Sequence, residues 1–173
     1  MAVKKVVKMG NVHLASPSRA IDDLQDPMLS AIIADMRDTM LAEDGAGIAA
    51  PQIGQYVRII MFGIEEENRR YPHRSAIPFT VLINPVIRPL TEETELGWEG
   101  CLSVPGMRGL VPRYTQIEYS GLDEQGQLLT RVADGFHARV VQHECDHLDG
   151  ILYPFRIQDL RYFGFEDELA TLF

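Results

Sequence analysis

The chain has 173 residues, of which 46% are hydrophobic and 24% charged, and its formal net charge is -9. These values are close to the average for folded proteins and exclude a disordered or collagen-like chain. The length suits a single domain spanning residues 1–173. The negative charge argues against a nucleic-acid substrate or an anionic membrane as partner, because both attract basic surfaces.

The cysteines and the N-terminus favour a cytoplasmic protein. Cys101 and Cys145 are the two cysteines of the chain, and a chain of this length does not need a disulfide to fold. The start of the chain, MAVKKVVKMG, has no apolar run of signal-peptide length because Lys8 interrupts it. No segment approaches the roughly 18 apolar residues of a membrane span.

The first predicted helix begins at Pro27, with Asp26 as its N-cap and Gly45 beyond its end. Apolar residues follow at three- and four-residue spacing: Leu29, Ile32, Ile33, Met36 and Met40. Such a one-sided helix should lie against a sheet.

Strands are predicted in the middle of the chain. Segments 57–62 and 81–87 are apolar and rich in β-branched residues, and Pro85 suggests an edge strand or a bulge. The polar segment 65–75 between them is interpreted as a loop. Segments 116–119 and 128–132 flank turn residues and predict a hairpin.

A second helix is predicted over residues 136–148, capped by Asp134 and ended by Gly150. Its apolar side chains cover most of its circumference, so we expect it to be buried on most sides. The order helix, strands, hairpin, helix predicts an α+β fold in which antiparallel β-sheets pack around this central helix.

The central helix carries the motif HExxH as His143-Glu144-Cys145-Asp146-His147. Histidines four residues apart project from the same face, so both can reach one metal ion, and Glu144 can take a proton from a water beside it. A buried helix with so many polar groups is hard to explain without an ion. Cys145 points away from the histidines and is predicted to pack in the core.

The third metal ligand has two candidates. Glu166, with Asp167 beside it, lies downstream as in a zincin-type metallopeptidase, but in a charged cluster near the chain end. Cys101 lies upstream between glycines, which would suit a loop wrapped around a ligand, and it would complete a Cys–His–His set with an open position for water. We favour Cys101; a peptidase using Glu166 and a non-catalytic metal-binding protein remain the alternatives.

A glycine-rich segment, GAGIAAPQ at residues 45–52, lacks the spacing of a nucleotide-binding loop. Its Gln52 follows Pro51 and could donate a hydrogen bond to a developing oxyanion. Asp146 cannot face the metal together with the histidines, and we expect it to bond to Arg108 or Arg113.

The segments GAGIAAPQ, EGCLSVPG and QHECDHLDG together resemble the three signature motifs of the peptide deformylase family, over roughly residues 9–155. The resemblance implies that Cys101, His143 and His147 are metal ligands and that Glu144 is the general acid/base. It implies that Gln52 and the backbone N–H of Leu102 are oxyanion donors. The residues implied to line or shape the substrate cleft are Gly47, Ile48, Glu99 and Gly100.

The reaction implied is removal of the formyl group from the N-terminal formyl-methionine of nascent polypeptides, which releases formate. The implied cofactor is one divalent metal ion, ferrous iron in the cell, which zinc, nickel or cobalt can replace. Two features depart from the family: Trp98 precedes the Glu-Gly-Cys run, and the tail after Phe155 is acidic. Working near the ribosome is implied, but docking on it through a basic C-terminal helix is not expected.

Overall fold

The computed structural model describes residues 2–64 and 75–169. The predicted loop at 65–75 therefore lies outside the described residues except for its last position. The helices are α1 (Pro27–Ala42), α2 (Gly135–Leu148) and the short α3 (Glu166–Leu169), with 3-10 turns η1 (Val12–Ala15), η2 (Ala50–Ile53), η3 (Tyr153–Arg156) and η4 (Leu160–Tyr162). The strands are β1 (Gly47–Ala49), β2 (Ile59–Ile64), β3 (Ile77–Pro89), β4 (Thr94–Cys101), β5 (Val104–Tyr114), β6 (Gln116–Leu122), β7 (Leu128–Asp134) and β8 (Phe163–Phe165).

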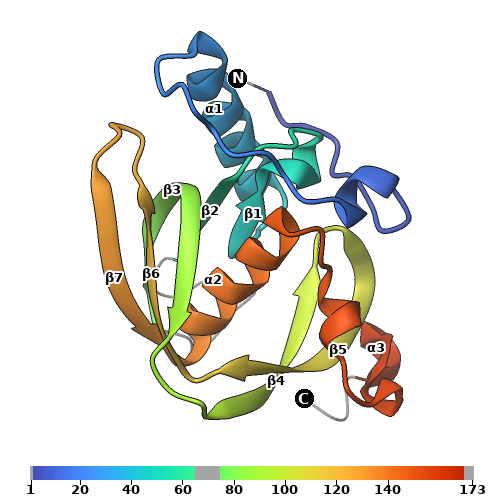
Figure 1. Cartoon of the computed structure of the whole chain (residues 1–173). Helices are drawn as coiled ribbons and strands as arrows, with labels where there is room; N and C mark the ends of the chain where they lie inside the picture. Colours follow the sequence, from blue (N-terminus) through green and yellow to red (C-terminus); the bar gives the residue numbers. More distant parts are fainter. Residues whose placement is uncertain (1, 65–74, 170–173) are drawn as a thin grey trace.

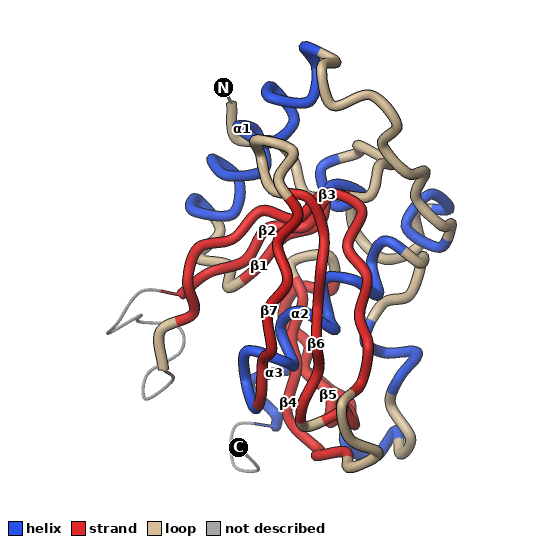
Figure 2. Tube along the Cα trace, turned by 60° about the vertical axis from the view of Figure 1, so that its left-hand side comes forward, coloured by secondary structure: helices blue, strands red, loops and turns tan. Residues whose placement is uncertain are grey.

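Two antiparallel sheets enclose the second helix. One has five strands in the order β1-β2-β3-β6-β7, and the other has three in the order β4-β5-β8. Figure 1 shows α2 in the centre of the molecule, with β3, β6 and β7 on one side and β4 and β5 on the other. Figure 2, turned by 60°, shows the same helix behind β6 and β7. The predicted α+β arrangement around a central helix is confirmed.

The first helix, α1, begins and ends as the sequence predicts. The side chain of Asp26 accepts from the N–H of Met28, and Pro27 occupies the first turn. The predicted apolar stripe faces inward, with Leu29, Ile33, Met36 and Met40 buried. They form one hydrophobic cluster with residues of β1, β2 and β3, so α1 covers the face of the large sheet opposite to α2.

The strand at Pro85 is bulged. The register of β3 against β6 shifts between Ile83 and Val86, and Asn84 has a φ of 52°. The Asn84 side chain accepts from the N–H of Ile21 and donates to its carbonyl, which fixes the unusual backbone. Of the two predictions for Pro85, the bulge is confirmed. The edge strand is not, because β3 lies between β2 and β6 in the sheet.

The loop expected around Cys101 is reduced to a turn at Leu102 and Ser103 between two strands. Residues 47–53 form β1 and η2, and the segment around Cys101 forms the hairpin of β4 and β5. Gly97 has a packing reason within β4: a Cβ there would lie 2.6 Å from the guanidinium carbon of Arg139. Gly97 thus leaves room for the side chain of Arg139 and does not serve a turn.

The central helix, α2, is buried along most of its length, as predicted, and Cys145 belongs to the main hydrophobic cluster. Asp134 is the N-cap residue, but its side chain makes no capping hydrogen bond, so this part of the prediction was wrong. At the other end Arg58 donates to the carbonyl of Leu148, and Gly150 takes a φ of 75°. Both ends of the helix are thus held by neighbouring segments.

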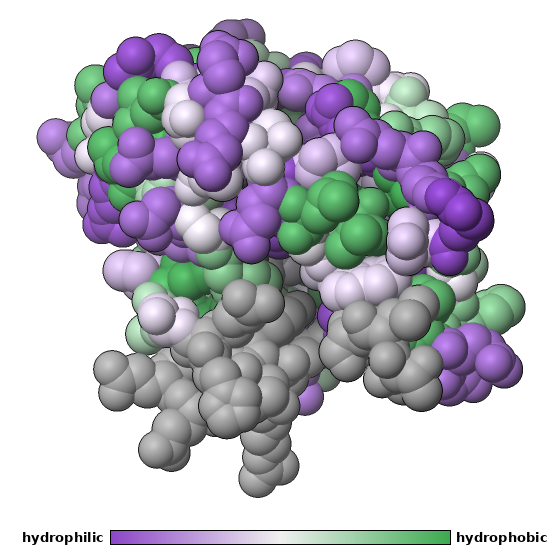
Figure 3. Space-filling model, turned by 90° about the horizontal axis from the view of Figure 1, so that it is seen from below, coloured by the Kyte–Doolittle hydropathy of each residue, from purple (hydrophilic) through white to green (hydrophobic). Residues whose placement is uncertain are grey.

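On the face seen in Figure 3, hydrophobic side chains form small groups among hydrophilic ones. Among residues 2–64 and 75–169, no helix combines the length and hydrophobicity needed to cross a membrane.

Candidate metal centre and active site

Three potential ligands meet where the end of β4 faces α2. The Cys101 sulfur and one nitrogen each of His143 and His147 lie within 4.8 Å of one another. Sγ of Cys101 is 3.3 Å from Nε2 of His147. The two histidines come from successive turns of α2, and Cys101 is the last residue of β4. The sequence therefore predicted which side chains would converge.

The orientation of His143 is fixed by a carboxylate. Its Nδ1 lies 2.8 Å from Oε2 of Glu99, which leaves Nε2 to face Cys101. Such a carboxylate–histidine pair holds the ring and its tautomer for metal binding. Glu99 is two residues before Cys101 on the same strand, so β4 supplies both a candidate ligand and the group that orients another.

Glu99 belongs to a buried chain of ion pairs. Arg113 donates to both carboxylate oxygens of Glu99 at 2.9 and 3.0 Å and to Asp146 at 2.6 Å. Arg139 donates to Glu99 at 3.0 Å, and Arg156 pairs with Asp146 at 2.7 Å. Burial alone would raise the pKa of Glu99, but hydrogen bonds from His143 and Arg113 outweigh it and lower the pKa.

Two arginines were expected as alternative partners of Asp146. The prediction of Arg113 is confirmed, and the prediction of Arg108 is wrong. Arg108 donates instead to Glu166, at 2.6 Å. Glu166 is exposed, and Cys101, His143 and His147 form the metal-binding group found among the described residues. The structure thus offers no support for Glu166 as third ligand or for the peptidase alternative.

The residues fit a divalent metal ion. A thiolate and two imidazoles are the ligands that zinc and iron accept, and ligand atoms around such an ion stand about 3.3–3.8 Å apart. The buried Nδ1 of His147 and Oε2 of Glu144 have no hydrogen-bond partner among the described residues. Glu144 lines the cavity, where water or substrate can complete the bonding of its carboxylate, whereas Nδ1 of His147 is the ring nitrogen that does not face Cys101.

Glu144 is held close to β1. A Cβ on Gly47 would lie 2.5 Å from Oε1 and 2.8 Å from Cγ of Glu144. Only glycine at position 47 therefore leaves room for this carboxylate in its present position. Burial raises the pKa of Glu144 to about 7, which suits a group that gains and loses a proton near neutral pH.

Gln52 is buried and its amide is oriented. Its Oε1 accepts from the N–H of Ala49 at 2.8 Å, so Nε2 faces Ser103 at 3.2 Å and Cys101 at 3.5 Å. The backbone carbonyls of Gln52 and Ser103 accept from the N-terminal segment, at Val7 and Met9. An amide donor is thus fixed beside the candidate metal ligands.

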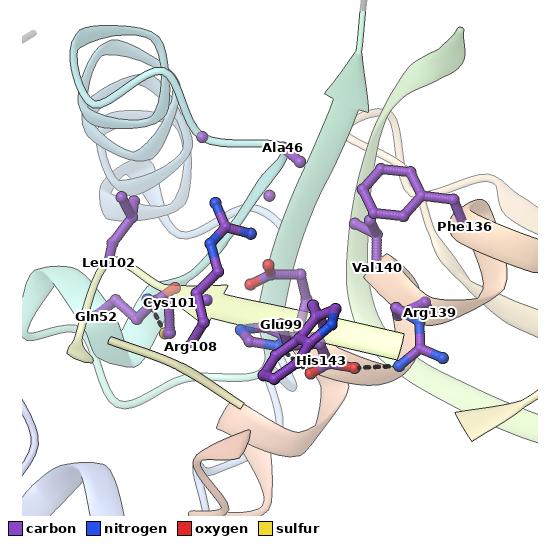
Figure 4. Close-up of a pocket in the computed structure, with 15 residues that line it drawn as sticks. Ala46, Gln52, Glu99, Cys101, Leu102, Arg108, Phe136, Arg139, Val140 and His143 are labelled. Carbon is purple, nitrogen blue, oxygen red and sulfur yellow. Dashed lines mark hydrogen bonds and ion pairs between the residues drawn. The ribbon is translucent and has the colours of Figure 1, made fainter. Parts of the chain in front are cut away.

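One cavity collects most of the residues singled out from the sequence (Figure 4). Those that line it are Gly47, Gln52, Glu99, Gly100, Cys101, Leu102, His143 and Glu144. His147 is not among the lining residues and is almost fully buried. Ile48 is not brought to the cavity either, because its side chain lies in the core cluster under α1.

The cavity also contains side chains that sequence reasoning missed. Figure 4 shows Phe136, Arg139 and Val140 of α2 on the side opposite to Gln52 and Leu102. Arg139 could have been found, because it precedes His143 by four residues and so shares its helix face. Its guanidinium donates to the carbonyls of Glu95, Gly97 and Val111. This arginine ties α2 to both strands of the hairpin.

Comparison with known proteins agrees with this site. The family model described as polypeptide deformylase matches residues 3–162. Peptide deformylase 1 of Nitrosomonas europaea is 58% identical over 167 residues, which cover 96% of this chain and 94% of that protein. Peptide deformylase 2 of Ralstonia nicotianae is 54% identical over the same shares of the two chains.

Among solved structures, a class I type b peptide deformylase from Acinetobacter baumannii with bound Met-Ala-Ser superposes with a TM-score of 0.84. The two sequences are 39% identical, and the match covers 90% of this chain and 99% of the other. The chain therefore belongs to the polypeptide deformylase family, the metal-dependent hydrolases that remove the N-terminal formyl group from new polypeptides.

Proposed function

We propose that Cys101, His143 and His147 hold one divalent metal ion, ferrous iron in the cell, which zinc, nickel or cobalt can replace. The observation that carries this proposal is the meeting of these three side chains beside Glu144 and Gln52 at one cavity. The soft thiolate with two imidazoles suits iron as well as zinc. When bound, the ion supplies Lewis-acid chemistry, polarising the formyl carbonyl and acidifying water.

Glu144 moves the protons of the reaction. Its Oε2 has no hydrogen-bond partner among the described residues and is available to water or substrate. It takes a proton as water attacks the formyl carbon and delivers it to the leaving amine when the C–N bond breaks. Its pKa of about 7, raised by burial, matches both tasks.

Gln52 and Leu102 stabilise the negative charge that develops on the formyl oxygen. The Gln52 amide is fixed by the N–H of Ala49, so its Nε2 is held beside Cys101. The N–H of Leu102 follows Cys101 directly, in the turn between β4 and β5. Prepositioned donors of this kind act in the transition state without a reorganisation cost.

The remaining residues shape the cleft. Gly47 leaves the space that Glu144 occupies, Gly100 lines the cavity beside Arg108, and Glu99 holds the ring of His143. Ile48 acts indirectly, because it packs in the hydrophobic cluster under α1 that supports β1. Residues 1–173 form one catalytic domain in this proposal.

The substrates are nascent polypeptides that begin with formyl-methionine, and the place of action is the cytoplasm, near the ribosome. The C-terminal segment is not the docking element, because α3 consists of Glu166, Asp167, Glu168 and Leu169 and would be repelled by ribosomal RNA. Nucleic acid is not a substrate in this proposal, and neither is a membrane a partner.

Release of formate tests this function. The purified protein loaded with Fe(II) or Ni(II) should release formate from formyl-Met-Ala-Ser, measured with a coupled formate assay. Glu144→Gln should keep its metal, measured by elemental analysis, and lose about a thousandfold in kcat. If internal peptide bonds were cut and no formate appeared, or if Glu144→Gln turned over normally, the proposal would be wrong.

A further inference from the structure

Trp98 lies at the mouth of the cavity rather than in the core. It lines the cavity while remaining partly exposed, whereas its neighbour Glu99 is buried. Successive side chains of a strand point to opposite faces. Glu99 faces α2 with its ion pairs, so the side chain of Trp98 leaves β4 on the other face.

The position of Trp98 is set by the C-terminal segment. The Tyr162 ring meets its indole edge to face, with ring centroids 6.5 Å apart and planes at 73°. Tyr162 ends η4 and leads into β8, which pairs with β5 through Phe163 opposite Gly109. Because β5 also pairs with β4, Tyr162 is fixed relative to Trp98 by the sheet.

The other side of the entrance is formed by Arg108 and Gly100. A Cβ on Gly100 would make ordinary van der Waals contact with Met107 O at 3.6 Å and with Cγ and Cζ of Arg108 at 3.8 and 4.0 Å, so position 100 lies against Arg108. Figure 4 shows Arg108 between Leu102 and Glu99, and Glu166 accepts from its Nε. The entrance therefore has an aromatic wall and a cationic wall with backbone between them.

We infer that Trp98, held in place by Tyr162, contacts the residue that follows formyl-methionine and favours an apolar or aromatic side chain there. The inference rests on the proposed function. The formyl group must reach Cys101, which is buried, and His143, whose side chain is 11% exposed, so the residue after methionine lies toward the entrance where Trp98 stands. An indole gives a rigid apolar surface, and stacking on it rewards a ring more than a methyl group.

Kinetics with three peptides test this inference. We expect Trp98→Ala to raise KM for formyl-Met-Phe-Ser about tenfold, to raise KM for formyl-Met-Ala-Ser less, and to leave formyl-Met within about twofold. kcat should stay within about twofold for all three. Tyr162→Ala should raise the same KM values in the same order but by less. Trp98→Phe and Tyr162→Phe keep an aromatic ring and should stay close to the wild-type KM values.

Leu96→Ala is the matched control, because Leu96 lies two residues before Trp98 on β4, is 55% exposed and does not line the cavity. It should change none of these constants. Equal losses with all three substrates in Trp98→Ala, or no loss with any, would overturn the inference. Wild-type protein that released no formate from any of them would contradict the proposed function instead.

A second measurement does not depend on turnover. Trp98 is the only tryptophan of the chain, so intrinsic fluorescence excited at the indole band reports on this position alone. Titrating Zn(II)-loaded Glu144→Gln with formyl-Met-Phe-Ser should move the emission to shorter wavelength as water leaves the indole, and formyl-Met should do so much less. An emission that does not respond to formyl-Met-Phe-Ser, although binding is seen by calorimetry, would overturn the inference.

Discussion

At the scale of single residues, the contact between Gly47 and Glu144 decides where the general acid/base stands. The carboxylate of Glu144 fills the space that a side chain at position 47 would need. The contact links β1 with α2, so the proton-moving group is positioned by a strand as well as by its own helix. A glycine in a strand interior often marks such a close approach.

Gly47→Ala should therefore displace Glu144. We expect kcat for formyl-Met-Ala-Ser to fall about a hundredfold, because catalysis depends on placement to within a fraction of an ångström. The metal content should not change, since the three atoms nearest to a Cβ at position 47 all belong to Glu144 and none belongs to a candidate ligand. Steady-state kinetics and elemental analysis of the purified variant would check both statements.

The control for this substitution is the double variant with Glu144→Gln. If Gly47→Ala acts only through the carboxylate, it should cost little more activity once that carboxylate is gone. A full additional hundredfold loss in the double variant would mean that Gly47 acts on another part of the site.

At the scale of elements, α2 is joined to the β4–β5 hairpin by charges as well as by the candidate metal ligands. Arg113 on β5 bridges Glu99 on β4 and Asp146 on α2, and all three side chains are almost fully buried. Buried ion pairs contribute little net stability, but removal of one partner leaves the others charged in a medium that solvates them poorly.

Arg113→Met should therefore lower the free energy of unfolding of the metal-free protein by about 3–5 kcal/mol. Urea titration followed by far-UV circular dichroism would measure it. Arg88→Met is the matched control, because Arg88 pairs with Glu118 on the surface and its side chain is 65% exposed. That change should stay within about 0.5 kcal/mol. Equal small losses in both variants would show that the buried pairs are not coupled to stability.

A second link between elements depends on pH. His137 of α2 lies 3.2 Å from the hydroxyl of Tyr119 on β6, and burial with the charge of Arg131 lowers the pKa of His137. The folded protein thus prefers the neutral ring, whereas the unfolded chain takes up a proton near pH 6.5. The contribution of neutral His137 to the free energy of unfolding is therefore fully present above pH 6.5 and decreases as the pH falls below it.

Comparison of wild type with His137→Phe isolates this effect, because the other titrating groups are shared. We expect the free energy of unfolding of wild type, relative to the variant, to fall between pH 8 and pH 5 when both proteins are metal-free. Urea titrations at four pH values would measure the difference. A difference that is constant over this range, or that grows toward pH 5, would contradict the lowered pKa.

Local patterns in the sequence predicted these elements well, and long-range contacts account for what they missed. The spacing of His143 and His147 and the cap of α1 depend on neighbouring residues, so they could be read directly. That Arg113 rather than Arg108 bonds to Asp146 depends on a contact across 33 positions of the chain. The glycines around Cys101 and the HExxH helix already favoured Cys101 as third ligand, and the family motifs agreed, but no local pattern places Gly97 against Arg139.

At the scale of the whole molecule, the candidate metal ligands connect two parts of the fold that are otherwise far apart in the chain. Cys101 belongs to the smaller sheet, and both histidines belong to the helix that packs on the larger one. An ion held by all three would bind the folded chain and not the unfolded one. Binding of this kind stabilises the folded state by RT ln(1 + L/Kd), where L is the free metal concentration.

Removal of the metal by a chelator should therefore lower Tm. At a metal concentration about a thousand times Kd the linkage is worth about 4 kcal/mol, or roughly 10 °C for a chain of this size. Differential scanning calorimetry with and without Zn(II) would measure the increment. Cys101→Ala should abolish most of it, because the ion would lose its only bond to the smaller sheet, whereas Glu166→Ala should keep all of it. If Glu166→Ala abolished the increment and Cys101→Ala kept it, Glu166 would be the third ligand and the peptidase alternative would be favoured.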